Sequence, residues 1–293
     1  MAISYVVITP ARNEERVIEL TLRSMVVQTV VPLKWVIVDD GSTDATSEIV
    51  ERYASRYDWI TLIHRPPHEK REFASKVHSF NAGFELVKDL PYDIIANLDA
   101  DLTFDADFFE FLLKKFEEMP QLGVAGTHYT EESYSSITDS YQGDTFVNGC
   151  MQLFRRECFD EIGGYVPSPG GGIDWIAVTT ARMRGWTTRA FSEKMFFHNR
   201  AAGTGESNLF DAAVKGGKRD YLQGNHPLWE FFRCIYKMKS KPYLVNGVVV
   251  WLGYMWSWMT GVERPISHEL LVFNRNEEME KLRGIFKSLF VKK

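Results

Sequence analysis

The 293-residue chain has few cysteines, and they form no pattern typical of a disulfide or zinc protein. Cys150, Cys158 and Cys234 are an odd number, are widely spaced and include no CxxC pair. We therefore expect a protein of a reducing compartment, without a disulfide framework. The first residues also show no basic stretch followed by an apolar one, so we predict no signal peptide and a cytoplasmic location.

An excess of positive charge is missing too. The 34 lysines and arginines are outnumbered by 39 aspartates and glutamates, which leaves a net charge of −5. A protein that binds nucleic acid through bulk positive charge is therefore not expected. Apolar residues at 45% and charged residues at 25% are ordinary values for a globular protein, and they exclude a disordered, collagen-like or coiled-coil chain.

Two glycine-rich phosphate motifs are absent as well. The turn after the first predicted strand reads PARNEE, so the GxGxxG of a Rossmann dehydrogenase is missing, and no GxxxxGK[ST] of a P-loop occurs. The same turn lacks the glycine-rich loop with a following basic residue that a sugar-phosphate nucleotidyltransferase would show. That enzyme class stays an alternative because it shares the α/β nucleotide-binding plan.

The pattern that is present is an alternation of strands and helices. Helical spacing covers 15–28 and 73–88, a helix is expected to end near Tyr57, and Asp105 is the expected N-cap of another. Predicted strands lie at 3–9, which Pro10 should end, and at 34–39, 59–64 and 93–98. This order predicts an α/β fold with a mostly parallel sheet covered on both faces, and ligands of such sheets bind beyond the carboxyl ends of the strands.

Polar clusters follow three of these strands, at residues 9–14 (TPARNE), 39–44 (DDGSTD) and 97–101 (NLDAD). Acidic side chains crowded at one edge repel each other, which usually means that a cation or ligand donors offset the repulsion. Asp99 and Asp101 flank Ala100, so an extended or turning backbone can point both carboxylates the same way. Hard oxygen ligands at this spacing suit Mg²⁺ or Mn²⁺ that bridges phosphates.

TPARNEE, VDDGSTD and NLDADL, in this order and spacing, resemble the motifs of the family 2 inverting glycosyltransferases over about residues 3–200. The resemblance implies the GT-A fold, a Rossmann-like mostly parallel sheet flanked by helices, here followed by a C-terminal helical extension. It also implies transfer of a sugar from a nucleoside-diphosphate sugar to a hydroxyl group. The expected division is a transferase domain at 1–222, with a donor half at about 1–102 and an acceptor half at 103–222, and a helical segment at 223–293.

The resemblance implies a role for particular residues of the donor half. Asp40 would read the edge of the base, which favours a UDP-sugar, and Asp101 would hold Mg²⁺ or Mn²⁺ on the diphosphate. Asp99 would lie by the ribose and the sugar. The other residues that would contact the donor are Pro10, Arg12, Glu14, Lys76, Asn81 and Ala100. For Lys76, a solvated helix charge is the alternative.

In the second half, residues 148–155 resemble the family's strand beneath the donor sugar, and residues 170–175 its acceptor loop. Asp174 would be the general base, although Ile173 stands where the family has Glu. The acceptor loop would also use Gly171, Gly172 and Trp175. His198 would join the metal or the diphosphate. Asp174 could instead be the N-cap of its helix, and His198 could be a buried core residue. Because Ile173 replaces the family's Glu, a sugar-nucleotide-binding or scaffold protein that has lost catalysis is a further alternative. Residues 200–211 favour a mobile lid, and Lys215 and Arg219 could either reach the diphosphate from there or form a solvated helix face.

The C-terminal part is aromatic and basic. Residues 244–261 contain no charge, and as a helix they would extend ~27 Å, barely the thickness of the hydrocarbon layer. Near the C-terminus, the apolar residues Leu282, Ile285, Phe286, Leu289 and Phe290 accompany Lys281, Arg283, Lys287, Lys292 and Lys293. We predict that residues 233–293 rest on the cytoplasmic face of an anionic membrane, which would suit a lipid-linked or polysaccharide acceptor. A spanning helix and a helical subdomain or dimer interface are the alternatives.

Overall fold

The computed structural model describes residues 3–66, 73–132, 134–139, 143–168, 171–200, 209–239 and 243–291. The chain divides into two compact units, which we call the sheet unit (1–169 and 173–201) and the helical unit (170–172 and 202–293). The strands are β1 (Tyr5–Ala11), β2 (Lys34–Asp39), β3 (Ile60–His64), β4 (Ile94–Leu98), β5 (Leu102–Thr103), β6 (Leu122–Glu131), β7 (Tyr134–Ser135), β8 (Met151–Arg155) and β9 (Thr187–His198). The helices of the sheet unit are α1 (Ile18–Val26), α2 (Thr46–Ala54), α3 (Phe73–Phe84), α4 (Phe108–Glu118), α5 (Ser136–Asp139), α6 (Arg156–Ile162) and α7 (Ile173–Met183).

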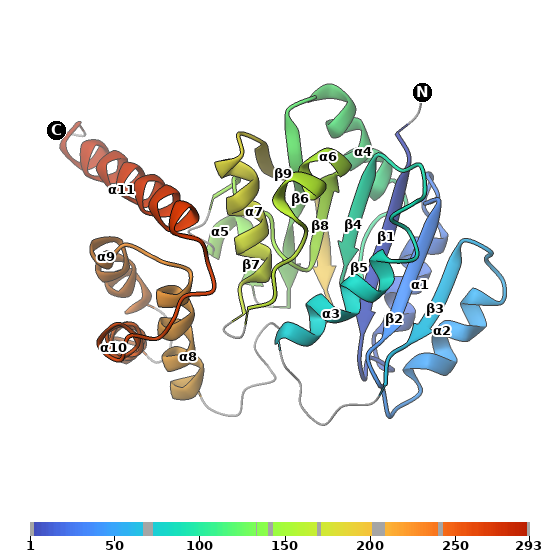
Figure 1. Ribbon diagram of the computed structural model, residues 1–293, viewed down its shortest axis with the longest axis horizontal. Helices are drawn as coiled ribbons and strands as arrows, with labels where there is room; N and C mark the ends of the chain where they lie inside the picture. Colours follow the sequence, from blue (N-terminus) through green and yellow to red (C-terminus); the bar gives the residue numbers. More distant parts are fainter. Residues whose placement is uncertain are drawn as a thin grey trace. The chain divides into compact units, whose positions relative to one another are not determined.

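The strands form one mixed, mostly parallel sheet in the order β3-β2-β1-β4-β8-β6-β9-β5, with β7 paired to β6 (Figure 1). Strands β1 to β4 run parallel, β8 runs antiparallel to both β4 and β6, and β9 runs parallel to β6. The carboxyl ends of β1, β2, β3, β4, β6 and β9 therefore meet the start of β8 at one edge, which we call the strand-end edge. The predicted α/β class is confirmed.

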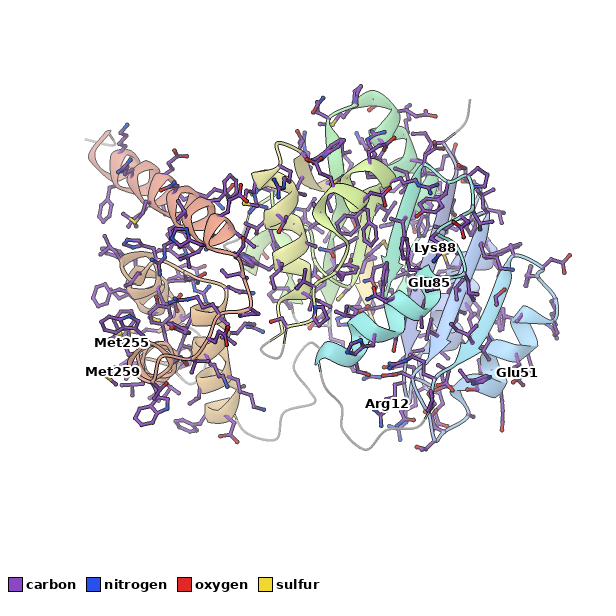
Figure 2. All side chains as sticks on the ribbon, viewed as in Figure 1. Arg12, Glu51, Glu85, Lys88, Met255 and Met259 are labelled. Carbon is purple, nitrogen blue, oxygen red and sulfur yellow. The ribbon has the colours of Figure 1, made fainter. Side chains whose placement is uncertain are left out.

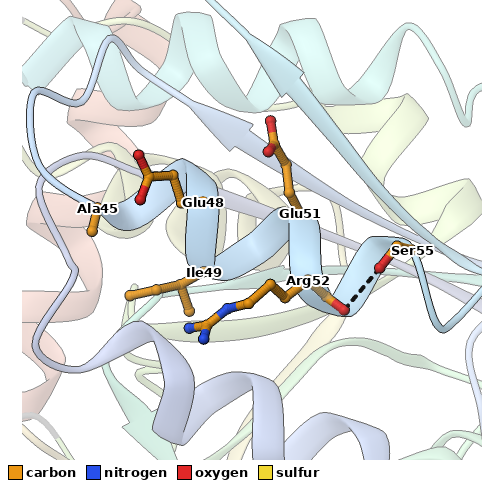
Figure 3. A pocket seen from close by; sticks show the side chains of 6 residues that line it. All are labelled: Ala45, Glu48, Ile49, Glu51, Arg52 and Ser55. Carbon is orange, nitrogen blue, oxygen red and sulfur yellow. Dashed lines mark hydrogen bonds between the residues drawn. The ribbon is translucent and has the colours of Figure 1, made fainter.

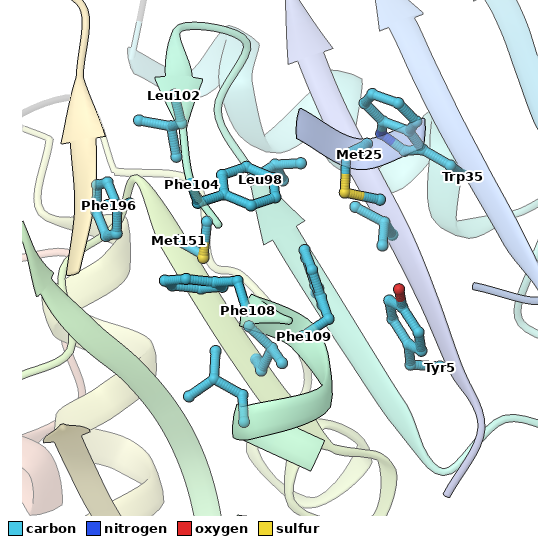
Figure 4. Close-up of a cluster of buried hydrophobic side chains, with 14 of the residues drawn as sticks. Tyr5, Met25, Trp35, Leu98, Leu102, Phe104, Phe108, Phe109, Met151 and Phe196 are labelled. Carbon is cyan, nitrogen blue, oxygen red and sulfur yellow. The ribbon is translucent and has the colours of Figure 1, made fainter. Parts of the chain in front are cut away.

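Each inner strand is buried on both faces because alternate residues point to opposite sides of the sheet. Tyr5 and Val7 of β1 join the core under α1, α2 and α4, which also contains Trp35, Phe108 and Phe109 (Figure 4). The intervening residues of the same strands pack against α3, α6 and α7. The strands thus read as continuous apolar runs, as in a sheet with helices on both faces.

Two of the predicted element ends that differ in the structure have a clear physical cause. Strand β1 continues through Pro10 to Ala11, and this is tolerated because β1 pairs with β4 only as far as Ile8. Helix α4 begins at Phe108, with Asp107 rather than Asp105 as its N-cap. The side chain that caps this helix comes from elsewhere in the chain. The Phe109 N–H donates to Oε1 of Gln28 at 3.1 Å.

The helical unit contains α8 (Leu209–Leu222), α9 (Pro227–Lys237), α10 (Val245–Met259) and α11 (His268–Val291). Helix α8 belongs to this unit because it packs closely along α10, so the compact division falls near residue 201 rather than at 222. A division of function at residue 222 stays a prediction. Across the described helices, none is both long enough and apolar enough to cross a membrane.

Candidate active site

The loops that follow β1 and β2 are interlocked at the strand-end edge. Asn13 has a positive φ of 54°, and its Oδ1 accepts the Thr43 N–H at 2.8 Å. The Asn13 N–H donates to Ser42 Oγ at 3.0 Å, and the Glu14 N–H donates to Thr46 Oγ1 at 2.8 Å. Two of the three polar clusters in the sequence therefore form one continuous wall.

Asp39 holds the turn that starts α2. Its carboxylate accepts the Ser42 N–H at 2.9 Å and the Ser47 hydroxyl at 2.7 Å, and His64 Nδ1 lies 3.1 Å away. Burial alone would raise the pKa of Asp39, but these hydrogen bonds outweigh it and hold the pKa below its usual value. The side chain is therefore engaged in building the loop.

Asp40 instead faces the end of β3 and the start of α3. Its Oδ1 accepts from Arg65 Nη1 at 2.5 Å, and its Oδ2 accepts from Ser75 Oγ at 2.5 Å. Arg65 also donates to Ser79 Oγ at 2.8 Å. Sequence reasoning missed Arg65, although its position directly after β3 is a signal of the kind that identified the other strand ends.

Lys76 and Asp99 form an ion pair at the end of β4. Lys76 Nζ lies 2.5 Å from Asp99 Oδ1 and 3.2 Å from the Gly149 carbonyl oxygen. Asn97 Nδ2 donates to the same carbonyl at 2.8 Å. Burial disfavours the charge on Lys76, but the attraction of Asp99 outweighs burial and raises the pKa of the Lys76 ammonium. Lys76 is thus a charged member of this site rather than a solvated helix residue.

Asp101 lies beside His198. His198 Nε2 is 3.2 Å from Asp101 Oδ2, and His198 Nδ1 is 3.0 Å from Glu131 Oε1. Burial alone would lower the pKa of His198, but its hydrogen bonds and charge attraction with the two carboxylates raise that pKa to about 9. Glu131, at the end of β6, was missed because β6 was not predicted from the sequence.

The other carboxylate oxygen of Asp101 is buried and has no hydrogen-bond partner among the described residues. The Asn199 N–H and its Nδ2 both donate to the Asp101 carbonyl, at 2.8 and 2.9 Å, and so fix the backbone there. Within the described part of the chain, no group of three or more His, Cys, Asp or Glu residues is placed to hold a metal ion. A metal at Asp101 would therefore need ligands from a bound molecule.

Asp174 lies in the first turn of α7, which begins at Ile173, and is therefore not the N-cap. Its side chain packs directly against Gly149, where an added Cβ would be 2.7 Å from Asp174 Cβ and 2.9 Å from Oδ2. Gly149 is the residue whose carbonyl accepts from Lys76 and Asn97. The structure thus brings Asp174, Lys76 and Asp99 to one place.

Of the other residues predicted to contact the donor, three lie in the loops at the strand-end edge, and Asn81 lies on a different side of α3 from Lys76. Arg12 is half-buried just after β1 (Figure 2), buried Glu14 is paired with Arg200, and buried Ala100 separates the two aspartates. Asn81 is exposed and lies about 140° around α3 from Lys76, so the structure does not bring it to the same side of the helix.

The acceptor-loop residues are described only in part. Gly171 and Gly172 have φ values of 77° and 75°, a region that favours glycine, and Trp175 is half-buried in α7. Gly170 and most of the expected lid, residues 201–208, lie outside the described residues.

A surface hollow on α2 contains none of these residues (Figure 3). It lies along α2, and at the end of that helix the Ser55 hydroxyl donates to the Arg52 carbonyl at 3.1 Å. Its lining residues are Ala45, Glu48, Ile49, Glu51, Arg52 and Ser55.

Solved structures share the fold. A mannosyltransferase of Pyrobaculum calidifontis in complex with GDP-Man and Mn²⁺ matches with a TM-score of 0.56 at 16% identity, over 99% of this chain and 88% of that one. Residues 1–349 of Staphylococcus aureus TarS in complex with UDP-GlcNAc match with a TM-score of 0.57 at 12% identity, over 86% of this chain and 72% of that one. These likenesses identify the architecture as a GT-A-like glycosyltransferase fold.

The family follows from sequence matches. Residues 6–141, just under half of the chain, match the family model Glycosyl transferase family 2, which assigns this part of the chain to that family. The poly-β-1,6-N-acetyl-D-glucosamine synthase of Staphylococcus aureus (strain COL) is 27% identical over 142 residues, 48% of this chain and 32% of that protein. A probable glycosyltransferase of Bacillus subtilis (strain 168), YdaM, is 37% identical over 101 residues, 33% of this chain and 22% of that protein. The match thus spans about a third or less of each curated relative.

Proposed function

We propose that the chain transfers a sugar from a nucleoside-diphosphate sugar, with a UDP-sugar preferred, to a hydroxyl acceptor with inversion at the anomeric carbon. The observation that carries the proposal is the convergence of the Lys76–Asp99 pair, the Asp101–His198 pair and Asp174 at the strand-end edge. The bound UDP-GlcNAc of one structural neighbour and the GDP-Man of another support a nucleotide-sugar donor.

The donor would lie along the wall formed by the loops after β1 and β2. Pro10, Arg12 and Glu14 would line the nucleotide, and Asp40 would accept an N–H from the base. Both Asp40 oxygens accept hydrogen bonds from this chain, and a carboxylate oxygen can accept more than one. Lys76, held by Asp99, would contact the sugar or its phosphate.

Mg²⁺ or Mn²⁺ fits the residues that are present. The unpartnered, buried Oδ1 of Asp101 is a hard oxygen ligand, and His198 lies beside the same carboxylate. These two residues would hold the ion, with diphosphate oxygens supplying further ligands. When bound, the ion supplies positive charge that offsets the charge of the departing diphosphate.

Asp174 would act as the general base. As the acceptor oxygen forms its bond to the anomeric carbon, its proton passes to Asp174, and the bond to the diphosphate breaks with the electron pair leaving on the nucleoside diphosphate. Because Gly149 has no side chain, the carboxylate can sit directly against the floor of the site. One displacement inverts the carbon, so no second, nucleophilic carboxylate is required.

The acceptor would be lipid-linked or a polysaccharide, and Gly171, Gly172 and Trp175 would contribute to its site. The name of the staphylococcal relative, a poly-β-1,6-N-acetyl-D-glucosamine synthase, supports a polysaccharide product. Both glycines have a positive φ, which residues with side chains rarely adopt, so the shape of this loop depends on glycine at both positions.

The proposal predicts a metal-dependent response to nucleotide. We would measure the melting temperature with UDP, GDP or dTDP, each with Mn²⁺ or with EDTA, for the unmodified chain and for Asp101→Asn. A nucleotide at ~100 times its dissociation constant adds ~2.7 kcal/mol, a shift of a few degrees for a chain of this size. We expect UDP with Mn²⁺ to give that shift and Asp101→Asn to lose it.

Asp58→Asn is the matched control, because Asp58 is an exposed carboxylate before the start of β3, at the opposite end of the strand from the site. It should respond as the unmodified chain does. No shift with any nucleotide would contradict the donor assignment. An equal shift in EDTA that survives Asp101→Asn would contradict the metal assignment alone.

A further inference from the structure

Helix α10 carries its large apolar side chains on the outside. Val245, Val248, Leu252, Trp256 and Met259 follow one another at intervals of three or four residues, so they lie on one face of the helix. Each is between 41% and 67% exposed. Figure 2 labels Met259 at the end of this row.

The inner face of the same helix makes its closest contacts at two glycines. A Cβ at Gly247 would be 2.1 Å from the Cys234 carbonyl oxygen, and a Cβ at Gly253 would be 2.5 Å from the Val214 carbonyl oxygen. These glycines let α10 pack backbone to backbone with α9 and α8. The packing of the unit therefore explains the glycine face, and it leaves the row of large apolar residues unexplained.

Helix α9 extends this surface. Leu228, Phe231 and Ile235 are spaced by three and four residues and are 44% to 46% exposed. The Phe231 ring lies 5.7 Å from the Trp251 ring of α10, centroid to centroid, so the two rows adjoin. We call these eight residues of α9 and α10 the apolar face. Contiguous exposed surface of this kind marks an interaction site.

The charge of the helical unit indicates what covers this face. Residues 202–293 contain 14 lysines and arginines and 9 aspartates and glutamates, a net charge of +5, whereas residues 1–201 contain 20 and 30, a net charge of −10. Arg283 and Lys287 of α11 are exposed beside Phe286, whose ring lies 5.3 Å from Phe232 of α9. The basic end of α11 thus packs against α9, one of the two helices that carry the apolar face.

We infer that the apolar face of α9 and α10 binds an anionic lipid bilayer, with both helices in the plane of the membrane. A basic rim around an apolar face is the pattern of an interfacial helix, and exposed Trp256 and Trp258 suit the headgroup region. A second copy of the chain fits less well, because it would bring a second net charge of +5 against the same face. This inference does not depend on the proposed transferase activity.

The test is flotation of the full-length chain with vesicles of phosphatidylcholine alone or of phosphatidylcholine mixed with phosphatidylglycerol. We expect binding to the anionic vesicles, weakened by added salt because exposed charges are screened. Leu252→Gln/Trp256→Gln should lower the partition coefficient by about tenfold or more, since two side chains lose their burial in lipid. Arg283→Gln/Lys287→Gln should lower it several-fold on anionic vesicles only.

Val27→Gln/Leu86→Gln is the control, because Val27 and Leu86 are exposed at 58% and 51% but belong to the sheet unit. It should bind as the unmodified chain does, and circular dichroism melting should show all variants folded. Failure to bind anionic vesicles would overturn the inference. So would unchanged binding of Leu252→Gln/Trp256→Gln, or a dimer in solution that this variant dissociates while vesicles capture no protein.

Discussion

At the scale of single residues, Asp174 is the side chain on which the proposed chemistry depends most. Asp174→Asn keeps the size of the side chain against Gly149 but removes its capacity to accept a proton. General-base catalysis typically contributes 10²- to 10⁴-fold, so we expect kcat to fall by about that factor. The affinity for UDP with Mn²⁺ should stay within about twofold, because the base does not hold the donor. Steady-state kinetics and calorimetry measure the two quantities.

Asp160→Asn is the matched control, because Asp160 is an exposed carboxylate on α6. It should leave kcat unchanged. If Asp174→Asn kept full activity, Asp174 would not be the base. If the unmodified chain bound UDP but transferred no sugar to any acceptor tried, the Ile173 departure would be read as a sign of lapsed catalysis.

At the scale of elements, the contact between α8 and α10 depends on which glycine of a neighbouring pair faces α10. A Cβ at Gly217 would be 2.0 Å from the Val250 carbonyl oxygen and 2.7 Å from the Tyr254 nitrogen, atoms that cannot move without displacing the helix. We therefore expect Gly217→Ala to lower the free energy of unfolding by ~1–3 kcal/mol or more, the usual cost of overpacking. Urea unfolding followed by circular dichroism measures it.

Gly216→Ala changes the adjacent residue of the same helix, where an added Cβ would meet no described atom within 4 Å. Alanine is the better helix former by ~0.5–1 kcal/mol, so this variant should be as stable as the unmodified chain or slightly more so. Equal stability of the two variants would show that α8 and α10 are not packed as described.

At the scale of the whole molecule, stability should depend on pH through Glu278 of α11. Burial raises the pKa of Glu278 from its ordinary 4.5 to about 8, although its carboxylate accepts the His226 N–H at 2.6 Å. Between these two pH values the folded chain holds the proton and the unfolded chain releases it. The stabilisation by this proton is complete below pH 4.5 and is lost as the pH rises through about 8, on the order of a few kcal/mol in total.

Glu278→Gln keeps an oxygen acceptor for His226 and cannot ionise. The variant should match the unmodified chain at pH 5 and exceed it increasingly toward pH 8, as measured by urea unfolding at several pH values. A constant difference between the two proteins across this range would mean that Glu278 does not carry the proton.

The sequence by itself predicted the alternation of strands and helices from β1 to α4. Strand 34–39 was predicted with its observed bounds, because a run of apolar residues between charged ends can be buried on both faces only inside a parallel sheet. The strand-end rule selected Asp40, Asp99 and Asp101, and the resemblance to family 2 added Lys76, Asp174 and His198. Residue types and motif spacing are local properties, and local properties can be read along the chain.

Only the tertiary structure decided which of these side chains meet. Strands β3 and β6 bring Arg65 and Glu131 to the site. Gln28 binds the start of α4, although it lies 77 residues before Asp105 in the chain. Asn81 turned away from Lys76 because α3 rotates about 100° per residue. The apolar run 244–261 likewise left open whether it crosses a membrane, enters a core or lies at a surface. The packing of its glycine face against α8 and α9 decides that α10 presents the opposite face outward, because each helix can bury only one side against its neighbours.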